Sequence, residues 1–335
     1  MKKIAITLLV CLLTLTLISQ NDKPLVVASA SMIADIAQNI GGDHVGIDMI
    51  VPIGGDPHLH EPTPNNARLV TQADLILING LTFEGWINEL IENSGTEAQT
   101  VTVTEGVRVL TSQTYQNSAD PHAWMDAANG IIYARNIKDA LVSLDPANEA
   151  AYMANYLSYV EELSKLDQEI LRAIQTIPEG KRVLITSHDA FQYYGTKYGI
   201  KLEAIMGIST EAEAQTSDII RVNKAIRDQQ IPAIFIESTI NPKLIEQLAH
   251  DNGITIGGKL YADSLGDKAS PASTYIDMLR YNTQTIVSAL TQDVGKIANQ
   301  DHNHHREDVK SQRSYIWLLA GVMLLGLGLL IYRMR

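Results

Sequence analysis

The sequence has almost no cysteine. Cys11 is the only one among 335 residues, and it lies inside an apolar run near the N-terminus. The rest of the chain therefore has no disulfide and no thiolate. This excludes a structural zinc site of the cysteine type and a cysteine nucleophile.

The chain also lacks a surplus of basic residues. It carries 26 Lys and Arg against 38 Asp and Glu, a formal net charge of −12. A nucleic-acid partner requires a basic face, so we exclude one. An acidic surface suits a protein that handles cations, although it serves solubility equally well.

Two enzyme motifs are missing as well. The sequence contains no His-Glu-x-x-His pair, which argues against a zinc hydrolase. No Gly-Lys-Ser/Thr follows Gly54-Gly55 or Gly257-Gly258, so we interpret both glycine pairs as turns rather than phosphate-binding loops.

The two ends of the chain differ from its middle. Lys2 and Lys3 precede an apolar run, which predicts a signal peptide or N-terminal anchor over residues 1–20. Residues 292–314 form a polar spacer. Residues 315–332 carry no charge, have aromatic residues at both ends and are followed by basic residues, which predicts a C-terminal transmembrane helix. The terminal basic residues favour cytoplasmic ends, so we expect the globular part to lie outside the cytoplasm.

Between these ends, strand-like and helix-like segments alternate. Short apolar runs such as Leu25–Ala28 and Leu75–Ile78 predict strands, and longer amphipathic runs such as Ala127–Leu144 predict helices. With 45% hydrophobic and 19% charged residues, the chain is globular and long enough for two domains. We therefore expect two α/β lobes with mostly parallel sheets, over residues 21–144 and 179–291.

Residues 145–178 predict one long helix between the lobes. Large apolar residues recur every three or four positions, at Tyr152, Tyr156, Val160, Leu163, Leu166, Ile170 and Ile174. Asp145 suits the N-cap, Pro146 suits the first helical position, and Pro178 ends the pattern. Such a helix is about 45 Å long and would serve as a rigid backbone for both lobes.

Histidines follow predicted strands and recur in a pattern. His58 and His122 each come directly after Asp-Pro, and His188 follows the strand that ends at Thr186. Asp263 also follows a strand. Ligands of α/β sheets bind beyond the carboxyl ends of strands, so these loop positions suit a site. The proline fixes the backbone before each histidine, and the preceding aspartate could orient the imidazole.

Six segments carry a resemblance to a known family. They are Asp56-Pro57-His58, Ala73 to Gly80, Asp120 to Trp124, Ser187 to Phe191, Pro232 to Ser238, and Asp263-Ser264. In order and spacing they resemble the zinc/manganese solute-binding proteins of ABC transporters (cluster A-I, the TroA-like family), over about Pro24 to Leu290. The resemblance implies two α/β lobes joined by a long rigid helix, with one metal ion bound between them by His58, His122, His188 and Asp263.

The implied function is capture of a divalent metal ion outside the cytoplasm and its delivery to an ABC permease. Three imidazoles and one carboxylate favour zinc, with manganese as the second candidate. We expect a monomer without enzymatic activity. Because metal binding requires neutral imidazoles, affinity should fall below about pH 6.

Two other functions stay open as alternatives. A metal-dependent hydrolase could use the same site, although four protein ligands leave no open position for an activated water. A surface adhesin would suit an anchored domain but would not explain four converging ligands.

The remaining histidines are weaker candidates. His60 should point away from His58 if the segment is extended. His44 and His250 fit structural positions, and Glu237 fits a hydrogen-bonding role. The cluster of His302, His304 and His305 departs from the family's pattern and could collect metal weakly.

Overall fold

The computed structural model describes residues 23–111, 118–211 and 214–291. The predicted signal or anchor (1–20), the polar spacer (292–314) and the predicted transmembrane helix (315–332) lie outside these ranges. None of the helices within the described ranges is both long and apolar enough to cross a bilayer.

The first lobe is built on a four-stranded parallel sheet. Its strand order is β2-β1-β3-β4. The strands are Gly46–Met49, Leu25–Ala28, Leu75–Ile78 and Gln99–Thr102, respectively. Both faces of β1 and β3 are buried, which explains why their sequences read as continuous apolar runs.

Alternate residues of these strands enter different layers, as the two-residue period of a strand requires. Val27, Ile76 and Ile78 pack under α3 (Pro64–Gln72) and α4 (Ile87–Ser94). Val26, Ala28, Leu75 and Leu77 join the main core with α2 (Ser31–Gly41) and α5 (Ala127–Leu144). The sheet thus lies between two helical layers, with its carboxyl edge free to carry loops.

The second lobe contains two parallel strand pairs. β5 (Val183–Thr186) pairs with β6 (Lys201–Ala204), β7 (Ala233–Glu237) pairs with β8 (Thr255–Leu260), and β5 contacts β7. One face is covered by α8 (Thr216–Gln229) and α9 (Lys243–Asn252). Leu184 and Phe235 point into the main core, to which α7 (Gln192–Tyr198) and α10 (Tyr275–Thr291) contribute.

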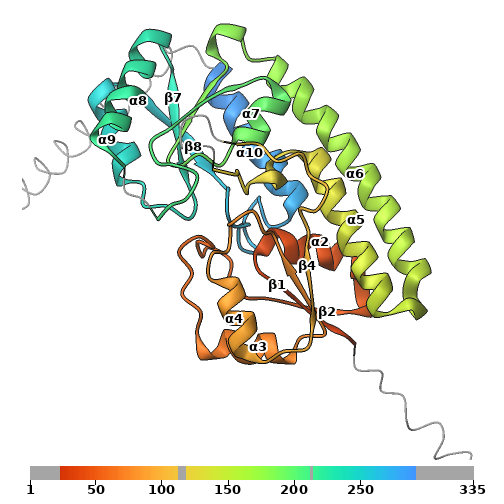
Figure 1. Ribbon diagram of the computed structural model, residues 1–335. Helices are drawn as coiled ribbons and strands as arrows, with labels where there is room; N and C mark the ends of the chain where they lie inside the picture. Colours follow the sequence, from red (N-terminus) through yellow and green to blue (C-terminus); the bar gives the residue numbers. More distant parts are fainter. Residues whose placement is uncertain (1–22, 112–117, 212–213, 292–335) are drawn as a thin grey trace, which may run out of the picture. The chain divides into compact units, whose positions relative to one another are not determined.

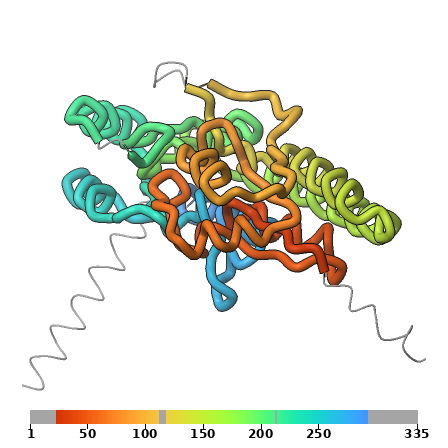
Figure 2. The backbone as a smooth tube through the Cα atoms, turned by 60° about the horizontal axis from the view of Figure 1, so that its bottom comes forward, coloured from red at the N-terminus to blue at the C-terminus, as the bar shows by residue number. Residues whose placement is uncertain are grey.

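The linking helix α6 (Glu149–Gln175) runs along both lobes beside α5 (Figure 1). The tube in Figure 2 shows it as one straight, unbroken rod. Tyr152, Tyr159, Leu163, Leu166, Ile170 and Ile174 form its buried face. The predicted helix is confirmed, with one change of face: Tyr159 is buried, whereas Tyr156 and Val160 are half-buried.

The predicted N-cap of this helix is wrong by three residues, because Asn148 rather than Asp145 occupies that position. Pro146–Asn148 form a short 3-10 turn, and Asp145 ends α5 instead of capping α6. Its carboxylate Oδ2 accepts hydrogen bonds from the Tyr152 hydroxyl (2.8 Å) and the Asn148 amide (2.6 Å). The side chains of Tyr152 and Asn148 thus bind the carboxylate that we expected to cap the backbone of α6.

Two elements were not predicted. α3 begins at a capping box in which Thr63 and Asn66 bond each other's backbone N–H, with Pro64 at the first position. The first turn of α3 is polar, so the apolar periodicity that predicts a helix is not visible in its sequence. β6 is a four-residue strand with only partial burial, so its sequence gave a weak signal.

Gly257-Gly258 is not a turn, contrary to our interpretation. Both glycines lie inside β8, where the pairing with β7 shifts by one residue between Ile234 and Phe235. A Cβ on Gly257 would approach Phe235 to 2.7 Å, and Gly258 has φ = 146°. The glycines therefore permit a bulge, and the strand continues to Leu260. By contrast, Gly54-Gly55 does form a turn, closed by the Gly55 N–H bond to the Pro52 carbonyl.

A matched pair of α6 variants tests the packing of this helix. Leu163 is fully buried, so Leu163→Ala should lower the free energy of unfolding by about 2–5 kcal/mol. Leu157 is 59% exposed on the same helix, so Leu157→Ala should change it by less than about 0.5 kcal/mol. Urea unfolding of the metal-free protein measures both. Equal effects would contradict the observed orientation of the helix.

Candidate metal centre

The two Asp-Pro-His segments adopt the same local turn. The backbone N–H of His58 donates to Asp56 Oδ1 (2.9 Å), and that of His122 donates to Asp120 Oδ1 (2.9 Å). An aspartate commonly accepts a bond from the N–H two residues on, and the intervening proline has its φ already fixed. The sequence thus defines the backbone of both histidines locally.

The two aspartates differ in what else they hold. Asp120 Oδ1 also lies 2.7 Å from His122 Nδ1, so the predicted orienting role is correct there. For Asp56 it is wrong, because its second oxygen accepts the hydroxyl of Thr210 in the second lobe (2.7 Å). Asp56 therefore positions the His58 backbone and contacts the opposite lobe, rather than the imidazole.

His188 has a different partner, supplied by the neighbouring strand. Glu237 ends β7; its Oε1 accepts the His188 backbone N–H (2.8 Å), and its Oε2 lies 2.6 Å from His188 Nδ1. The second contact is an ion pair without the alignment of a hydrogen bond. The expected hydrogen-bonding role of Glu237 is confirmed, although its link to His188 was not predicted. The contact could have been predicted only from the positions of the two residues, since β5 and β7 are neighbours and both end at this edge.

Asp263 enters the centre from the segment after β8. Its Oδ1 lies 3.4 Å from His122 Nε2 and its Oδ2 lies 3.2 Å from His188 Nε2. Both oxygens are buried and have no hydrogen-bond partner among the described residues. A buried carboxylate in this condition needs a positive charge beside it.

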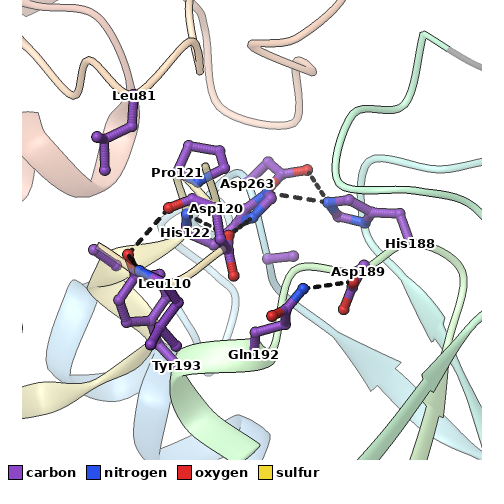
Figure 3. Close-up of polar contacts among 12 residues, drawn as sticks. Leu81, Leu110, Asp120, Pro121, His122, His188, Asp189, Gln192, Tyr193 and Asp263 are labelled. Carbon is purple, nitrogen blue, oxygen red and sulfur yellow. Dashed lines mark hydrogen bonds and ion pairs between the residues drawn. The ribbon is translucent and has the colours of Figure 1, made fainter. Parts of the chain in front are cut away.

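The four predicted residues converge. One nitrogen or oxygen from each of His58, His122, His188 and Asp263 lies within 4.8 Å of all the others. His122 Nε2 is 3.3 Å from the Nε2 atoms of both other histidines. Figure 3 shows His122, His188 and Asp263 directed toward one another. All four side chains are buried, so the centre is screened from water.

A strained turn supplies the apolar wall of this centre. Leu81 and Thr82 follow Gly80 with positive φ values of 53° and 65°, a conformation that costs about 1–3 kcal/mol for each non-glycine residue. The buried Glu84 carboxylate stabilises the turn by accepting the N–H groups of Asn79 (2.8 Å) and Gly80 (3.1 Å). Phe83 then packs edge-on against His58, with ring centroids 4.9 Å apart. Sequence reasoning missed this wall, because positive φ at leucine and threonine has no sequence signature.

The histidines differ in their proton affinity. Burial lowers the pKa of His58 to about 3, against the attraction of Asp263. Burial also disfavours the charged form of His122, but Asp120 and Asp263 outweigh it and raise that pKa to about 9. Burial is likewise outweighed at His188, where Glu237 and Asp263 raise the pKa well above its usual range. Burial would raise the pKa of Asp263, yet the two imidazoles hold it well below its ordinary value.

These shifts describe the centre without metal at neutral pH. Protons on His122 and His188 lie beside the Asp263 carboxylate, while His58 is neutral. A divalent cation at the same point would replace those protons. The expected loss of metal affinity below about pH 6 therefore moves to higher pH, because the His122 proton is held up to about pH 9.

The other described histidines lie elsewhere. His60 points away from His58, as predicted: its ring packs at a tilt against Trp86, with centroids 4.8 Å apart, and its Nε2 is 3.3 Å from Asn66 Oδ1. His44 packs against Tyr152 (5.9 Å), and the side chain of His250 is 84% exposed beside Asp251. His302, His304 and His305 lie outside the described residues.

Comparison with known proteins agrees with this architecture. The model of the family described as zinc-uptake complex component A, periplasmic, matches residues 26–289. The metal ABC transporter substrate-binding lipoprotein SsaB of Streptococcus sanguinis is 37% identical over 280 residues, covering 81% of this chain and 91% of SsaB. The manganese ABC transporter substrate-binding lipoprotein PsaA of Streptococcus pneumoniae is 35% identical over 280 residues, with 81% and 90% covered.

A solved structure shows the same two-lobed α/β fold. The periplasmic zinc-binding protein TroA of Treponema pallidum superposes with a TM-score of 0.77 at 34% identity, covering 81% of this chain and 100% of that one. The resemblance deduced from the six sequence segments is thereby confirmed. The chain belongs to the family of the periplasmic component A of zinc-uptake complexes.

Proposed function

We propose that this protein captures one divalent transition-metal ion outside the cytoplasm and delivers it to the permease of an ABC transporter. One observation carries the proposal. Four potential ligand atoms from both lobes converge within 4.8 Å in a buried centre, and both oxygens of Asp263 have no hydrogen-bond partner there. The names of SsaB and PsaA, both substrate-binding lipoproteins of ABC transporters, support the transport role.

The donor set favours zinc. Three imidazole nitrogens with one carboxylate match the ligands and the coordination number that zinc prefers. Zinc also ranks above manganese in intrinsic affinity for such ligands. Manganese is the second candidate, since PsaA is a manganese ABC transporter lipoprotein and TroA a zinc-binding protein, and this chain is similar to both. The Nδ1 atoms of His122 and His188 contact Asp120 and Glu237. Each Nε2 is therefore directed toward the point where the metal ion would bind.

The alternatives are less well supported. A hydrolase needs an open coordination position for water, whereas four protein side chains here converge on one point behind Phe83. An adhesin would have no use for a buried ligand cluster.

The proposed location is the outer side of the cytoplasmic membrane. The predicted N-terminal signal and the lipoprotein names of SsaB and PsaA support it. Attachment through residues 315–332 stays a prediction from sequence, as does the monomeric state.

Metal titration of single variants tests the site. The metal-free protein should bind one Zn²⁺ per chain in competition with a chelator of known affinity. His122→Ala and Asp263→Ala should abolish tight binding, because each removes a ligand from a buried site. His60→Ala is the matched control, since His60 lies two residues from His58 and points away. Parallel titration with Mn²⁺ ranks the two candidate ions.

Two results would contradict the proposal. One is a parent protein that binds no ion, or several ions weakly. The other is tight binding that survives the loss of His122 or Asp263.

Proton release gives an independent test. Because the pKa of His122 is about 9 and that of His188 is raised well above its usual range, both imidazoles carry protons at pH 7 that a metal ion must displace. We therefore expect about two protons to leave per ion bound, and the apparent affinity to rise with pH from 6 to about 9. Calorimetric titrations in buffers of different ionisation enthalpy measure the proton count. A pH-independent affinity over this range would refute the assigned charge states.

A further inference from the structure

We propose that the centre is assembled as three ligands plus one. His58, His122 and Asp263 form one group of ligands, which is attached to the first lobe. His188 is the single ligand attached to the second lobe. The inference rests on the proposed function. It departs from the division that the sequence implies, in which Asp263 follows a strand of the second lobe and would belong there.

The segment that carries Asp263 is bonded to the first lobe on both sides of the aspartate. Before it, the Ala262 carbonyl accepts the indole N–H of Trp124 (3.0 Å). After it, Ser264 Oγ accepts the N–H of Gly54 (2.7 Å), and the Leu265 N–H donates to Ser31 Oγ (2.9 Å). Asp263 is thus flanked by hydrogen bonds to three different parts of the first lobe.

The end of the same segment is also tied to the first lobe. The Tyr275 N–H donates to Asp35 Oδ2 (2.9 Å), and its hydroxyl donates to the Trp124 carbonyl. Figure 1 shows this stretch, in blue, leaving β8 and passing beside α2 before α10 begins. In the part of the chain that the structure describes, residues 262–275 make no hydrogen bond to residues 183–252. Their one polar contact with that region is Asp263 to His188, at the centre itself.

His188 is held in the opposite way. Its backbone N–H and its Nδ1 both contact Glu237, and its carbonyl accepts the Thr186 hydroxyl (2.8 Å). These partners belong to β7 and β5 of the second lobe. The helix that follows is fixed to the first lobe through Tyr193, whose hydroxyl donates to the Asp120 carbonyl (3.1 Å). Any movement of His188 is therefore limited to what the short connection between β5 and α7 allows.

Two serines hold the segment next to Asp263 on the first lobe. Ser31 is the first residue of α2 and is buried, and its Oγ lies 3.5 Å from Ser264 Oγ. Through the Leu265 N–H and Ser264, it determines where Asp263 stands relative to His58 and His122. Ser31 is therefore a positioning residue of the centre, and an ion can enter or leave by movement of His188 while the group of three ligands stays intact.

A reversible crosslink tests this assembly directly. In the full chain with Cys11→Ser, the pair Ser31→Cys and Ser264→Cys places two thiols where hydroxyls lie 3.5 Å apart. Oxidation should join the segment that carries Asp263 covalently to the first lobe. Zinc uptake, and the rate of zinc release to a chelator, should then be the same in the oxidised form of this variant as in its reduced form. Slower release by a factor of about ten or more, or blocked uptake, would show that the Asp263 segment must separate from the first lobe and would overturn the inference.

Ser31 substitutions provide the second measurement. Ser31→Ala leaves the Leu265 N–H without its acceptor, and we expect about tenfold weaker zinc binding, the loss typical of a residue that orients a ligand. Ser31→Thr keeps the hydroxyl and should restore affinity. The absorption spectrum of the Co²⁺ complex should change in Ser31→Ala and return in Ser31→Thr. An unchanged spectrum and affinity in Ser31→Ala would overturn the role of Ser31.

Zinc binding by the parent protein distinguishes failure of the proposed function from failure of the three-plus-one assembly. If it binds no zinc, the proposed function fails and this inference fails with it. If it binds zinc and the oxidised crosslink traps the ion, the function stands and the three-plus-one assembly is wrong.

Discussion

The centre depends on two contacts between a carboxylate and an imidazole. Asp120 holds His122 and Glu237 holds His188, each through Nδ1, so that both Nε2 atoms face one point. Without these partners the rings could rotate, and the buried donors would not converge. The contacts come from opposite lobes and yet have the same chemistry. The fold therefore brings loops at the carboxyl ends of strands from two sheets together at the candidate metal centre.

The main core explains how that place stays constant. α6 is one unbroken helix whose buried face contacts elements of both lobes, and the core around it continues from Val26 in the first sheet to Phe235 in the second. A change in the angle between the lobes would disturb this packing, so large rotations are disfavoured. If the protein binds a metal ion as proposed, we expect the accompanying changes to be confined to loops at the carboxyl ends of the strands, where the candidate ligands lie.

Much of this architecture could be predicted from sequence, because its signals are local. The bounds of β1, β3, α5 and β7 follow from apolar runs, and the Asp-Pro-His turns follow from the chemistry of aspartate and proline. What could not be predicted depends on contacts between distant residues. Examples are Asp56 with Thr210, Glu237 with His188, and the attachment of the Asp263 segment to Ser31. The two glycines of β8 were misread for the same reason, since only the partner strand shows that they form a bulge.

Among the residues that the structure describes, the potential ligands of the buried centre are imidazole and carboxylate groups, with no sulfur atom. Thiolates are oxidised readily outside the cytoplasm, where sites that use them must be protected or repaired. Here protons compete for the same positions as the metal, but oxidants do not. The capacity of this protein to hold an ion should therefore follow the acidity of its surroundings and remain indifferent to their redox potential.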